Sequence, residues 1–376
     1  MSADRLSTDH TNTVTVDREA PDARPAQPPA RVVRGTRASW AGLGALAALI
    51  VLLAYLPYLV SRGTQVSLVS LFALVVMGTM WNLLAGYGGM VSIGQQAYVG
   101  LGAYGLVVAA DKVGMSPYVA VPLAAVACGA VAFLASFLVF RLAGGYFAIG
   151  TWVLAEVAKL MTTQVDDLGG GSGISLAAFA GTRPALRIAY VYWLSLATAV
   201  LAVLAVYLLL RSRLGLGLTA IRDDATAAGS LGVEVARSKR IVYVVSAVGC
   251  GLAGGMLTAS TLRVTPDSIF SVNYTAAMLF IVIIGGIGTI EGPVVGAVVY
   301  YVLQEQLADL GAWYLVVLGV VAIAVTLFLP KGLWGLLSRG RYRIFPVGYR
   351  LADNAAAAGI PASAGEPATV PSRPLD

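Results

Sequence analysis

Two long segments of this chain carry no charged side chain. Asp, Glu, Lys and Arg are missing from residues 63–110 and again from residues 113–140. A transmembrane helix needs about 20 consecutive apolar residues, so each segment is long enough to cross a bilayer. Over the full 376 residues, 58% are hydrophobic and only 12% are charged, whereas an ordinary soluble domain is about 25% charged. The chain is therefore predicted to be an integral membrane protein.

The apolar segments predict three parts of the chain. Residues 1–39 and 346–376 are rich in Ala, Pro and polar side chains, so we expect two disordered tails. Residues 40–345 are predicted to form an all-α, polytopic membrane domain of about ten transmembrane helices, with a range of about 8–10. The expected spans are residues 41–60, 66–84, 90–110, 117–140, 146–161, 189–210, 241–262, 269–284, a short span ending near residue 304, and 310–329. Segment 90–110 is either a span or a re-entrant segment.

The basic residues predict the orientation of these spans. Lys and Arg collect in the amino-terminal tail, in residues 211–240 and in residues 331–350, and cytoplasmic segments of membrane proteins are enriched in both. An even number of spans on each side of residues 211–240 would place all three basic segments in the cytoplasm, including both termini. Residues 162–187, which contain Asp166 and Asp167, would then be extracytoplasmic. The net charge of +6 is explained by this orientation and does not indicate a nucleic-acid partner.

The first apolar run, residues 41–60, is membrane-length and is followed by further membrane segments. We therefore expect it to be a first span rather than the apolar part of a cleaved signal peptide. The predicted location is the inner (plasma) membrane, with multiple passes through the lipid bilayer.

The composition offers little from which to build a catalytic site. His10, the single histidine, lies in a predicted tail, and Cys128 and Cys250 each lie inside an apolar run. We therefore expect no metal site, no disulfide framework and no Ser-His-Asp set. The sequence also lacks the G-x-x-x-x-G-K-[ST] loop that cradles nucleotide phosphates. The chain is predicted not to be an enzyme, and any energy must come from another chain or from an ion gradient.

Two glycine-rich segments interrupt the apolar pattern. Residues 81–105 contain seven glycines together with Ser92, Gln95 and Gln96, and residues 285–297 contain a second glycine-rich turn. In lipid, non-helical backbone is tolerated only where protein or a water-filled cavity covers it. These segments indicate either a broken helix beside a translocation path or close packing of helices through small residues. The candidate path residues are Gly88, Gly89, Ser92, Gln95, Gln96, Glu156, Gly285 and Gly286.

Glu156 is a candidate because ionisable groups inside spans are often functional. It lies three residues before Lys159 on one predicted helix, so the two side chains can pair. The alternative is that both reach the membrane interface without a functional role.

Residues 211–240 form the one long charged segment between two membrane-length apolar runs. Asp224 is placed to cap a short helix, on which Ala225, Ala228 and Leu231 follow at helical spacing. Gly232 suits the position that ends the helix. A short helix with a small apolar face fits a groove on another protein, and the alternative is a solvated connector. The candidate docking residues are Arg222, Asp223, Asp224, Ala227, Ala228, Leu231 and Gly232.

At these residues the sequence resembles a known family. The run AIRDDATAAGSLGVEVARSK, residues 220–239, is similar to the cytoplasmic loop of permease subunits of ABC importers for branched-chain amino acids. Thr226-Ala227-Ala228 and Gly232 resemble the Glu-Ala-Ala-x-x-x-Gly coupling motif, with Thr226 in place of Glu and Asp223 or Asp224 as a substitute carboxylate. Further similar stretches are NLLAGYGGMVSIGQQAYVGLGAY, GGGSGI, SAVGCGLAGGMLTAS and GGIGTIEGPVVGA. The long amino-terminal extension and the loop look like those of the larger of the two permease partners.

The resemblance implies a type II-like ABC importer permease whose permease domain is residues 40–345, with residues 211–240 as its cytoplasmic coupling loop. It implies a heterodimer with a second permease subunit, two cytoplasmic ATP-binding subunits and an extracytoplasmic solute-binding protein. ATP would then bind to the partner subunits, and no cofactor is expected on this chain. The implied solutes are leucine, isoleucine and valine, or a related small solute such as urea or a short amide.

An ion-coupled secondary amino acid transporter is the alternative. Such transporters usually contain inverted repeats and ionisable groups near mid-membrane. This sequence shows no clear repeat, and Glu156 is its one acidic residue inside a predicted span. A membrane-embedded enzyme would need a nucleophile and a base, which the sequence does not supply together.

Overall fold

The computed structural model describes residues 32–33, 37–307, 311, 313–329, 332–338 and 350–351. The chain divides into two units, residues 35–348 and a unit formed by residues 1–34 and 349–376. In the smaller unit, β1 (Val32–Val33) pairs antiparallel with β4 (Arg350–Leu351). The rest of that unit, and with it most of the two predicted tails, lies outside the described residues.

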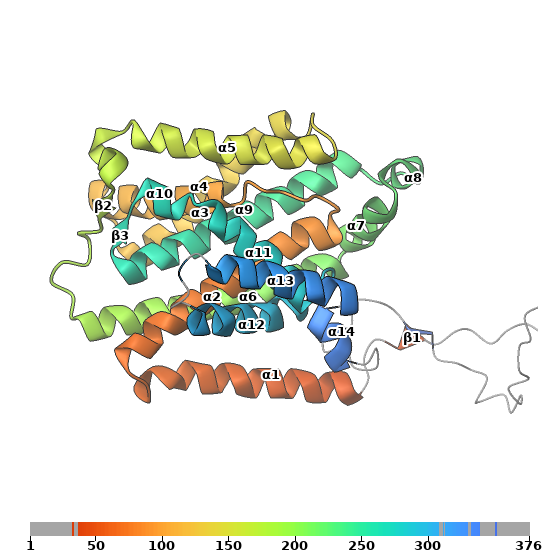
Figure 1. Cartoon of the computed structure of the whole chain (residues 1–376), viewed down its shortest axis with the longest axis horizontal. Helices are drawn as coiled ribbons and strands as arrows, with labels where there is room; N and C mark the ends of the chain where they lie inside the picture. Colours follow the sequence, from red (N-terminus) through yellow and green to blue (C-terminus); the bar gives the residue numbers. More distant parts are fainter. Residues whose placement is uncertain are drawn as a thin grey trace, which may run out of the picture. The chain divides into compact units, whose positions relative to one another are not determined.

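The larger unit is built from helices (Figure 1). Ten of these helices overlap the ten predicted spans, one helix for each span. These helices are α1 (Arg37–Tyr55), α2 (Arg62–Asn82), α3 (Gln96–Val107), α4 (Pro117–Val139), α5 (Gly145–Thr163), α6 (Pro184–Arg211), α9 (Val235–Thr261), α11 (Val272–Gly285), α12 (Gly292–Gln306) and α13 (Trp313–Phe328). Shorter helices are α7 (Arg213–Asp223), α8 (Ala225–Ser230), α10 (Pro266–Ile269) and α14 (Gly332–Ser338). The prediction of an all-α polytopic fold is confirmed.

Six helical segments within the described residues are long and apolar enough to cross a membrane. Helix α3 is shorter because the chain before it, after the π-helical turn η2 (Leu83–Tyr87), is not helical. Its 12 residues continue directly into the π-helical turn η3 (Val108–Lys112). At about 1.5 Å per residue, the helical segment from Gln96 to Lys112 is still shorter than the about 30 Å of hydrocarbon. Segment 90–110 therefore contains a short helix entered through a partly buried loop, and about ten spans is an approximate number.

Close helix packing accounts for several glycines. Most of α2 and α9 is buried inside the unit. A Cβ atom at Gly254 of α9 would overlap the carbonyl oxygen of Val99 on α3, and one at Gly102 would overlap the backbone of Gly251. Only glycine allows two helix backbones to approach this closely. The predicted packing role of small residues is therefore present between α3 and α9.

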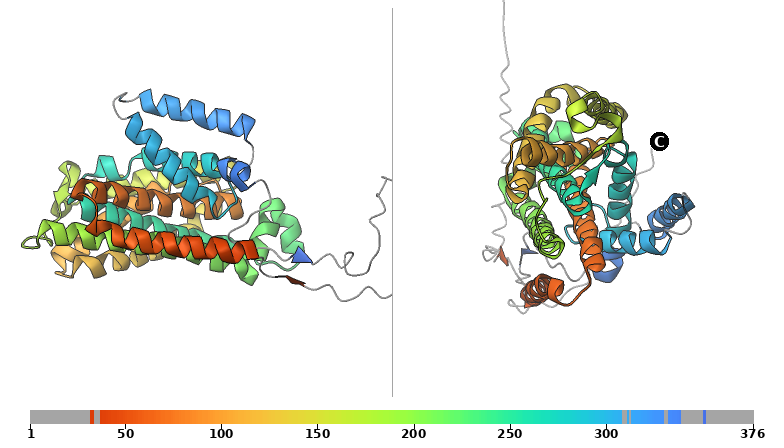
Figure 2. Two further views of the ribbon diagram at one scale, coloured as in Figure 1. Left: turned by 90° about the horizontal axis from the view of Figure 1, so that it is seen from below. Right: turned by 90° about the vertical axis from the view of Figure 1, so that its left-hand side faces the viewer.

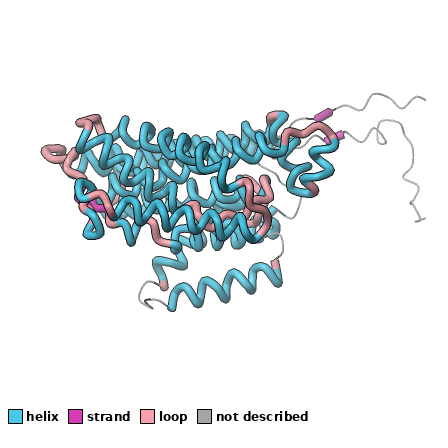
Figure 3. Tube along the Cα trace, turned by 90° about the horizontal axis from the view of Figure 1, so that it is seen from above, coloured by secondary structure: helices cyan, strands magenta, loops and turns pink. Residues whose placement is uncertain are grey.

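The loops gather mainly at the two ends of the long helices (Figure 3). At one end, β2 (Ile174–Ser175) pairs antiparallel with β3 (Arg263–Val264), next to α10. Helices α7 and α8 lie at the other end (Figure 1). Helices α11, α12 and α13 lie together on one side of the unit (Figure 2). Residues 162–187 and residues 211–240 are thus at opposite ends of the helices, as the predicted orientation requires.

Candidate coupling and translocation sites

Residues 211–240, the candidate coupling loop (called the coupling loop below), contain the short helices α7 and α8, and residues 235–240 already belong to α9. Asp224 ends α7 and caps α8, because its Oδ1 atom accepts hydrogen bonds from the backbone N–H groups of Thr226 at 2.7 Å and Ala227 at 3.0 Å. The hydrogen bonds from Ala227 and Thr226 lower the pKa of the Asp224 carboxyl below its ordinary value. Gly232 follows α8 with a φ of +84°. Both predictions, the Asp224 cap and the Gly232 helix end, are confirmed.

The exposed face of the coupling loop differs from the predicted one. Ala228 is only 2% exposed, whereas Leu231 is 82% exposed. Ala227 is also exposed, and α8 packs against α7 and α9. The expectation that Ala228 and Leu231 share one outward apolar face is wrong. A helix of six residues must use one of its small side chains to pack on its own chain, and Ala228 does so.

A second exposed leucine lies on the neighbouring helix. Leu216 of α7 is 63% exposed. Leu216 and Leu231 both lie within residues 211–240, at the end of the long helices where α7 and α8 are found. The sequence did not single out Leu216, which looks like one more apolar residue of α7 unless the packing is known.

Arg222 connects the coupling loop to the first glycine-rich segment. Its guanidinium Nη1 atom donates a hydrogen bond to the carbonyl oxygen of Gly86 at 3.0 Å. The backbone of Gly89, which has a φ of +65°, lies beside the Arg222 backbone, since a Cβ atom there would be 3.6 Å from the Arg222 Cα atom. The predicted site residues Arg222 and Gly89 are therefore neighbours.

The second glycine-rich segment meets the same place. Asn82 Nδ2 donates to the carbonyl oxygen of Thr289 at 2.7 Å, and Asn82 Oδ1 accepts from the N–H of Gly288 at 2.9 Å. A Cβ atom at Gly288 would lie 2.9 Å from Nη1 of Arg222. The ends of α2 and α11 are thus joined to each other and to α7. Asn82 was not among the site residues predicted from the sequence. The feature that could have indicated it is a side-chain amide at the point where an apolar span meets a glycine-rich turn.

The place where the ends of α2 and α11 meet α7 also contains three of the predicted path residues, Gly88, Gly285 and Gly286. A Cβ atom at Gly285 would overlap the carbonyl oxygen of Gly292, so glycine is needed where α11 ends and a tight turn leads into α12. Gly286 has a φ of +120°, and Gly88 ends η2. None of the three lines the cavity described below.

The polar residues Ser92, Gln95 and Gln96 are fully buried in the protein. Gln95 Oε1 accepts a hydrogen bond from Ser246 of α9 at 3.4 Å, and Gln96 Oε1 accepts one from Thr275 of α11. The Nε2 atom of Gln96 has no hydrogen-bond partner in the part of the chain that the structure describes. Gln95 and Gln96 thus link helices in the core, whereas the Ser92 hydroxyl accepts hydrogen bonds from Gly94 and Gln95 of its own segment. The role of all three in a translocation path stays a prediction.

Glu156 and Lys159 are half-buried on α5. The Nζ atom of Lys159 lies 2.7 Å from Oδ1 of Asp267, whereas the spacing in the sequence allowed a pair with Glu156. Lys159 pairs with Asp267 because α10 packs against α5. The resulting ion pair ties α5 to α10 at the end opposite the coupling loop.

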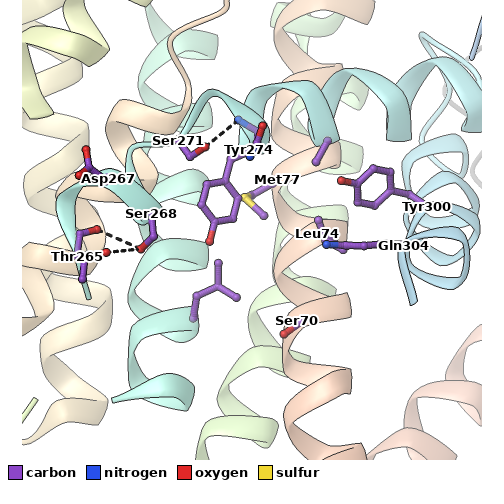
Figure 4. Close-up of a pocket in the computed structure, with 13 residues that line it drawn as sticks. Ser70, Leu74, Met77, Thr265, Asp267, Ser268, Ser271, Tyr274, Tyr300 and Gln304 are labelled. Carbon is purple, nitrogen blue, oxygen red and sulfur yellow. Dashed lines mark hydrogen bonds between the residues drawn. The ribbon is translucent and has the colours of Figure 1, made fainter. Parts of the chain in front are cut away.

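A cavity of about 630 Å³ opens beside this ion pair (Figure 4). It lies between α2, α9, α10, α11 and α12. No residue predicted for the path lines it. The side chains of Tyr274 and Tyr300 project into it from α11 and α12, and Asp267 is at its edge.

These features define a class of protein. Long apolar helices make the chain a multi-pass membrane protein, and an exposed loop is joined by polar contacts to the ends of its inner helices, as in a transporter permease. A family model described as "Branched-chain amino acid transport system / permease component" matches residues 63–326. This range contains α3 to α12 and most of α2 and α13, well over half of the chain. The chain therefore belongs to this family.

Two curated relatives agree with this family. Both are named "High-affinity branched-chain amino acid transport system permease protein LivM", one from Salmonella typhimurium strain LT2 and one from Escherichia coli strain K12. Each is 28% identical over 285 residues, which covers 69% of this chain and 67% of the relative. No solved structure matches the chain. The resemblance seen in the sequence is confirmed, and the relatives are transporter permeases rather than enzymes.

Proposed function

We propose that this chain is the membrane-spanning permease subunit of an ABC importer and that it translocates leucine, isoleucine, valine or a related small solute. The family and the names of the two relatives support the class of solute. The observation that carries the mechanism is the contact between Arg222 and Gly86. It connects an exposed loop to the inner helices, which a permease driven by a separate ATPase needs.

The coupling loop presents exposed apolar side chains to which a cytoplasmic ATP-binding subunit would bind. Leu231 and Leu216 are exposed, and an apolar side chain on a short helix fits a groove on a partner. The Asp224 carboxylate is engaged in capping α8, so Asp223, which is exposed, is the carboxylate available to replace the Glu of the family motif. Two such ATP-binding subunits would serve this chain and a second permease subunit, and a solute-binding protein would deliver the solute from outside.

Movement of α8 would reach the inner helices through Arg222. A hydrogen bond from a charged guanidinium is stronger than one between neutral groups. Asn82 holds the Gly86 and Gly288 segments together, so displacement of Arg222 acts on the ends of α2 and α11 at once. The two glycine-rich turns supply backbone that can bend there.

The positions of the loops support the proposed orientation. Residues 211–240 and residues 162–187 lie at opposite ends of the helices, and the former are basic. With both termini cytoplasmic, a membrane-impermeant thiol reagent added outside should label Ser172→Cys and leave Ser230→Cys unlabelled. Labelling of Ser230→Cys alone would reverse the orientation.

Binding of the ATP-binding subunit is tested by placing a charge at Leu231. Leu231→Asp should abolish recovery of the ATP-binding subunit with the tagged permease, because a desolvated carboxylate in an apolar groove is costly. Leucine uptake should be lost at unchanged membrane abundance. Leu186→Asp, an exposed leucine at the opposite end, is the control and should leave recovery unchanged. Normal recovery and uptake with Leu231→Asp would favour the ion-coupled alternative.

A further inference from the structure

The cavity between α2, α9, α10, α11 and α12 lies toward the end opposite the coupling loop. Thr265 and Asp267, which line it, directly follow β3, and β3 pairs with β2 at that end. Its volume of about 630 Å³ is within the range of about 300–1,000 Å³ typical of small-molecule sites. In the proposed orientation this is the side from which the solute arrives.

The inner wall of the cavity is apolar. Leu74 and Met77 of α2 and Ala277 of α11 are buried and line it, and Leu257 of α9 adds to the same wall. Such a wall favours an aliphatic group over water. A solute with no aliphatic part, such as urea, would gain nothing from these contacts.

The mouth of the cavity is polar. Ser268, Asn273 and Gln304 line it and are exposed. The side-chain amides of Asn273 and Gln304 can donate hydrogen bonds to a carboxylate, whereas the Ser268 hydroxyl donates to the carbonyl oxygen of Thr265. Figure 4 shows Ser268 and Gln304 on opposite sides of Tyr274, so the polar groups come from both α10 and α12.

Among the described residues that line the cavity, Asp267 is the one with a formal charge. A negative lining group favours a cationic group on the solute and disfavours an anion. Its Oδ1 atom meets Lys159 at 2.7 Å, and its side chain is 81% exposed. A carboxylate has about four acceptor positions, so one lysine leaves room for a second cationic donor.

The ion pair also fits the overall charge of an amino acid. Lys159 and Asp267 together are neutral, and so is a zwitterion. An amino acid can therefore enter with its ammonium group compensated by Asp267, whereas an amine or a carboxylate alone would bring an uncompensated charge.

We propose that this cavity receives the solute, with the ammonium group of an α-amino acid bound to Asp267 and its aliphatic side chain against Leu74, Met77 and Ala277. The proposal rests on the proposed function and narrows its solute to aliphatic amino acids, without urea or short amides. Asp267 would exchange or share its contact with Lys159 as the solute binds.

The proposed site is tested by placing a cysteine in the cavity and asking whether bound solute protects it from a thiol reagent. Ser268→Cys, and separately Gln304→Cys on the facing helix, are placed in the full chain within the assembled transporter in membranes. A membrane-impermeant thiol reagent is added from outside. Cys128 and Cys250 are buried and need no replacement. Ser172→Cys, exposed at the same end but outside the cavity, is the matched control.

L-leucine at about ten times its Kd should slow labelling in the cavity by about tenfold, because only empty sites react. Isopentylamine, which keeps the ammonium and the aliphatic group, should protect more weakly. Urea and 4-methylpentanoate should not protect, and Ser172→Cys should be labelled at the same rate throughout.

The role of the carboxylate is separated from that of the ion pair by two further variants. Asp267→Asn should abolish protection by leucine, while Lys159→Gln, which breaks the same ion pair but keeps the carboxylate, should retain it. Glu305→Gln, an exposed carboxylate on α12 that does not line the cavity, should behave like the unmodified chain.

Three results would overturn the proposal: no labelling or no protection by leucine at either cavity cysteine, equal protection by urea, or protection that persists in Asp267→Asn. Loss of ATPase recovery in Leu231→Asp without leucine protection would leave the proposed function standing and remove the cavity site. Leucine protection with normal recovery and uptake in Leu231→Asp would keep the site and remove the ABC assignment.

Discussion

The guanidinium of Arg222 and the carbonyl oxygen of Gly86 are 3.0 Å apart, although the two residues are separated by 136 positions in the chain. Through this hydrogen bond the exposed helix α7 holds the end of α2. Because Asn82 binds both the Gly288 and Thr289 backbone, the same contact reaches the turn between α11 and α12. A movement of the coupling loop therefore has a direct mechanical route to two inner helices.

Removing the Arg222 hydrogen bond should uncouple ATP hydrolysis from transport. Arg222→Met should keep the ATP-binding subunit attached, because Leu231 is untouched, but leucine uptake should fall by about tenfold or more, as a hydrogen bond to a charged group is worth about 1.5–3 kcal/mol. Uptake and ATP hydrolysis are measured on the same membranes. Arg213→Met, an exposed arginine on the same helix, is the control. Equal uptake by both variants would refute the transmission role.

Gly232 should tolerate asparagine and reject valine. Its φ of +84° with open space around it means that strain, and not volume, limits substitution. A β-branched side chain there costs about 1–2 kcal/mol, so Gly232→Val should reduce ATPase recovery and uptake, and Gly232→Asn should reduce them much less. Gly229→Ala within α8 should be neutral. If Gly232→Val matches Gly229→Ala, the left-handed conformation is not needed for docking.

The contact between α3 and α9 should depend on Gly254. Gly254→Ala would force a methyl group into the Val99 carbonyl oxygen, and overpacking of this kind costs about 1–3 kcal/mol. The thermal midpoint of the detergent-solubilised permease should therefore fall. Gly319→Ala on α13, where a Cβ atom meets nothing within 4 Å, should leave it unchanged. An unchanged midpoint in Gly254→Ala would show that the helices can separate freely.

Docking should be insensitive to pH near neutrality and weaken in acid. The pKa of Asp224 is lowered by the N–H groups of Ala227 and Thr226. A carboxyl whose pKa is lower in the folded state stabilises that state above its unfolded pKa, and this contribution disappears as pH falls through the folded pKa. Asp224→Asn caps the helix without titrating, so its ATPase recovery should fall less in acid than that of the unmodified chain, while Asp224→Ala should be impaired at every pH. An identical acid response of Asp224→Asn and the unmodified chain would assign the effect to other carboxylates.

Features encoded over short distances in the chain were correctly predicted from the sequence. The length of uncharged runs indicated a membrane protein, because a bilayer requires about 20 apolar residues per crossing. The Asp224 cap and the helix end at Gly232 also followed from local patterns, since both depend on backbone groups within a few residues. The family was recognisable because its motifs are themselves contiguous.

The tertiary structure alone decided which distant side chains meet. Lys159 pairs with Asp267 and not with Glu156, and Ala228 faces inward while Leu231 faces out. The cavity is lined by α2, α9, α10, α11 and α12, and none of its residues stood out in the sequence. These contacts depend on how helices far apart in the chain pack against one another, and apolar helices have few sequence features that specify their neighbours.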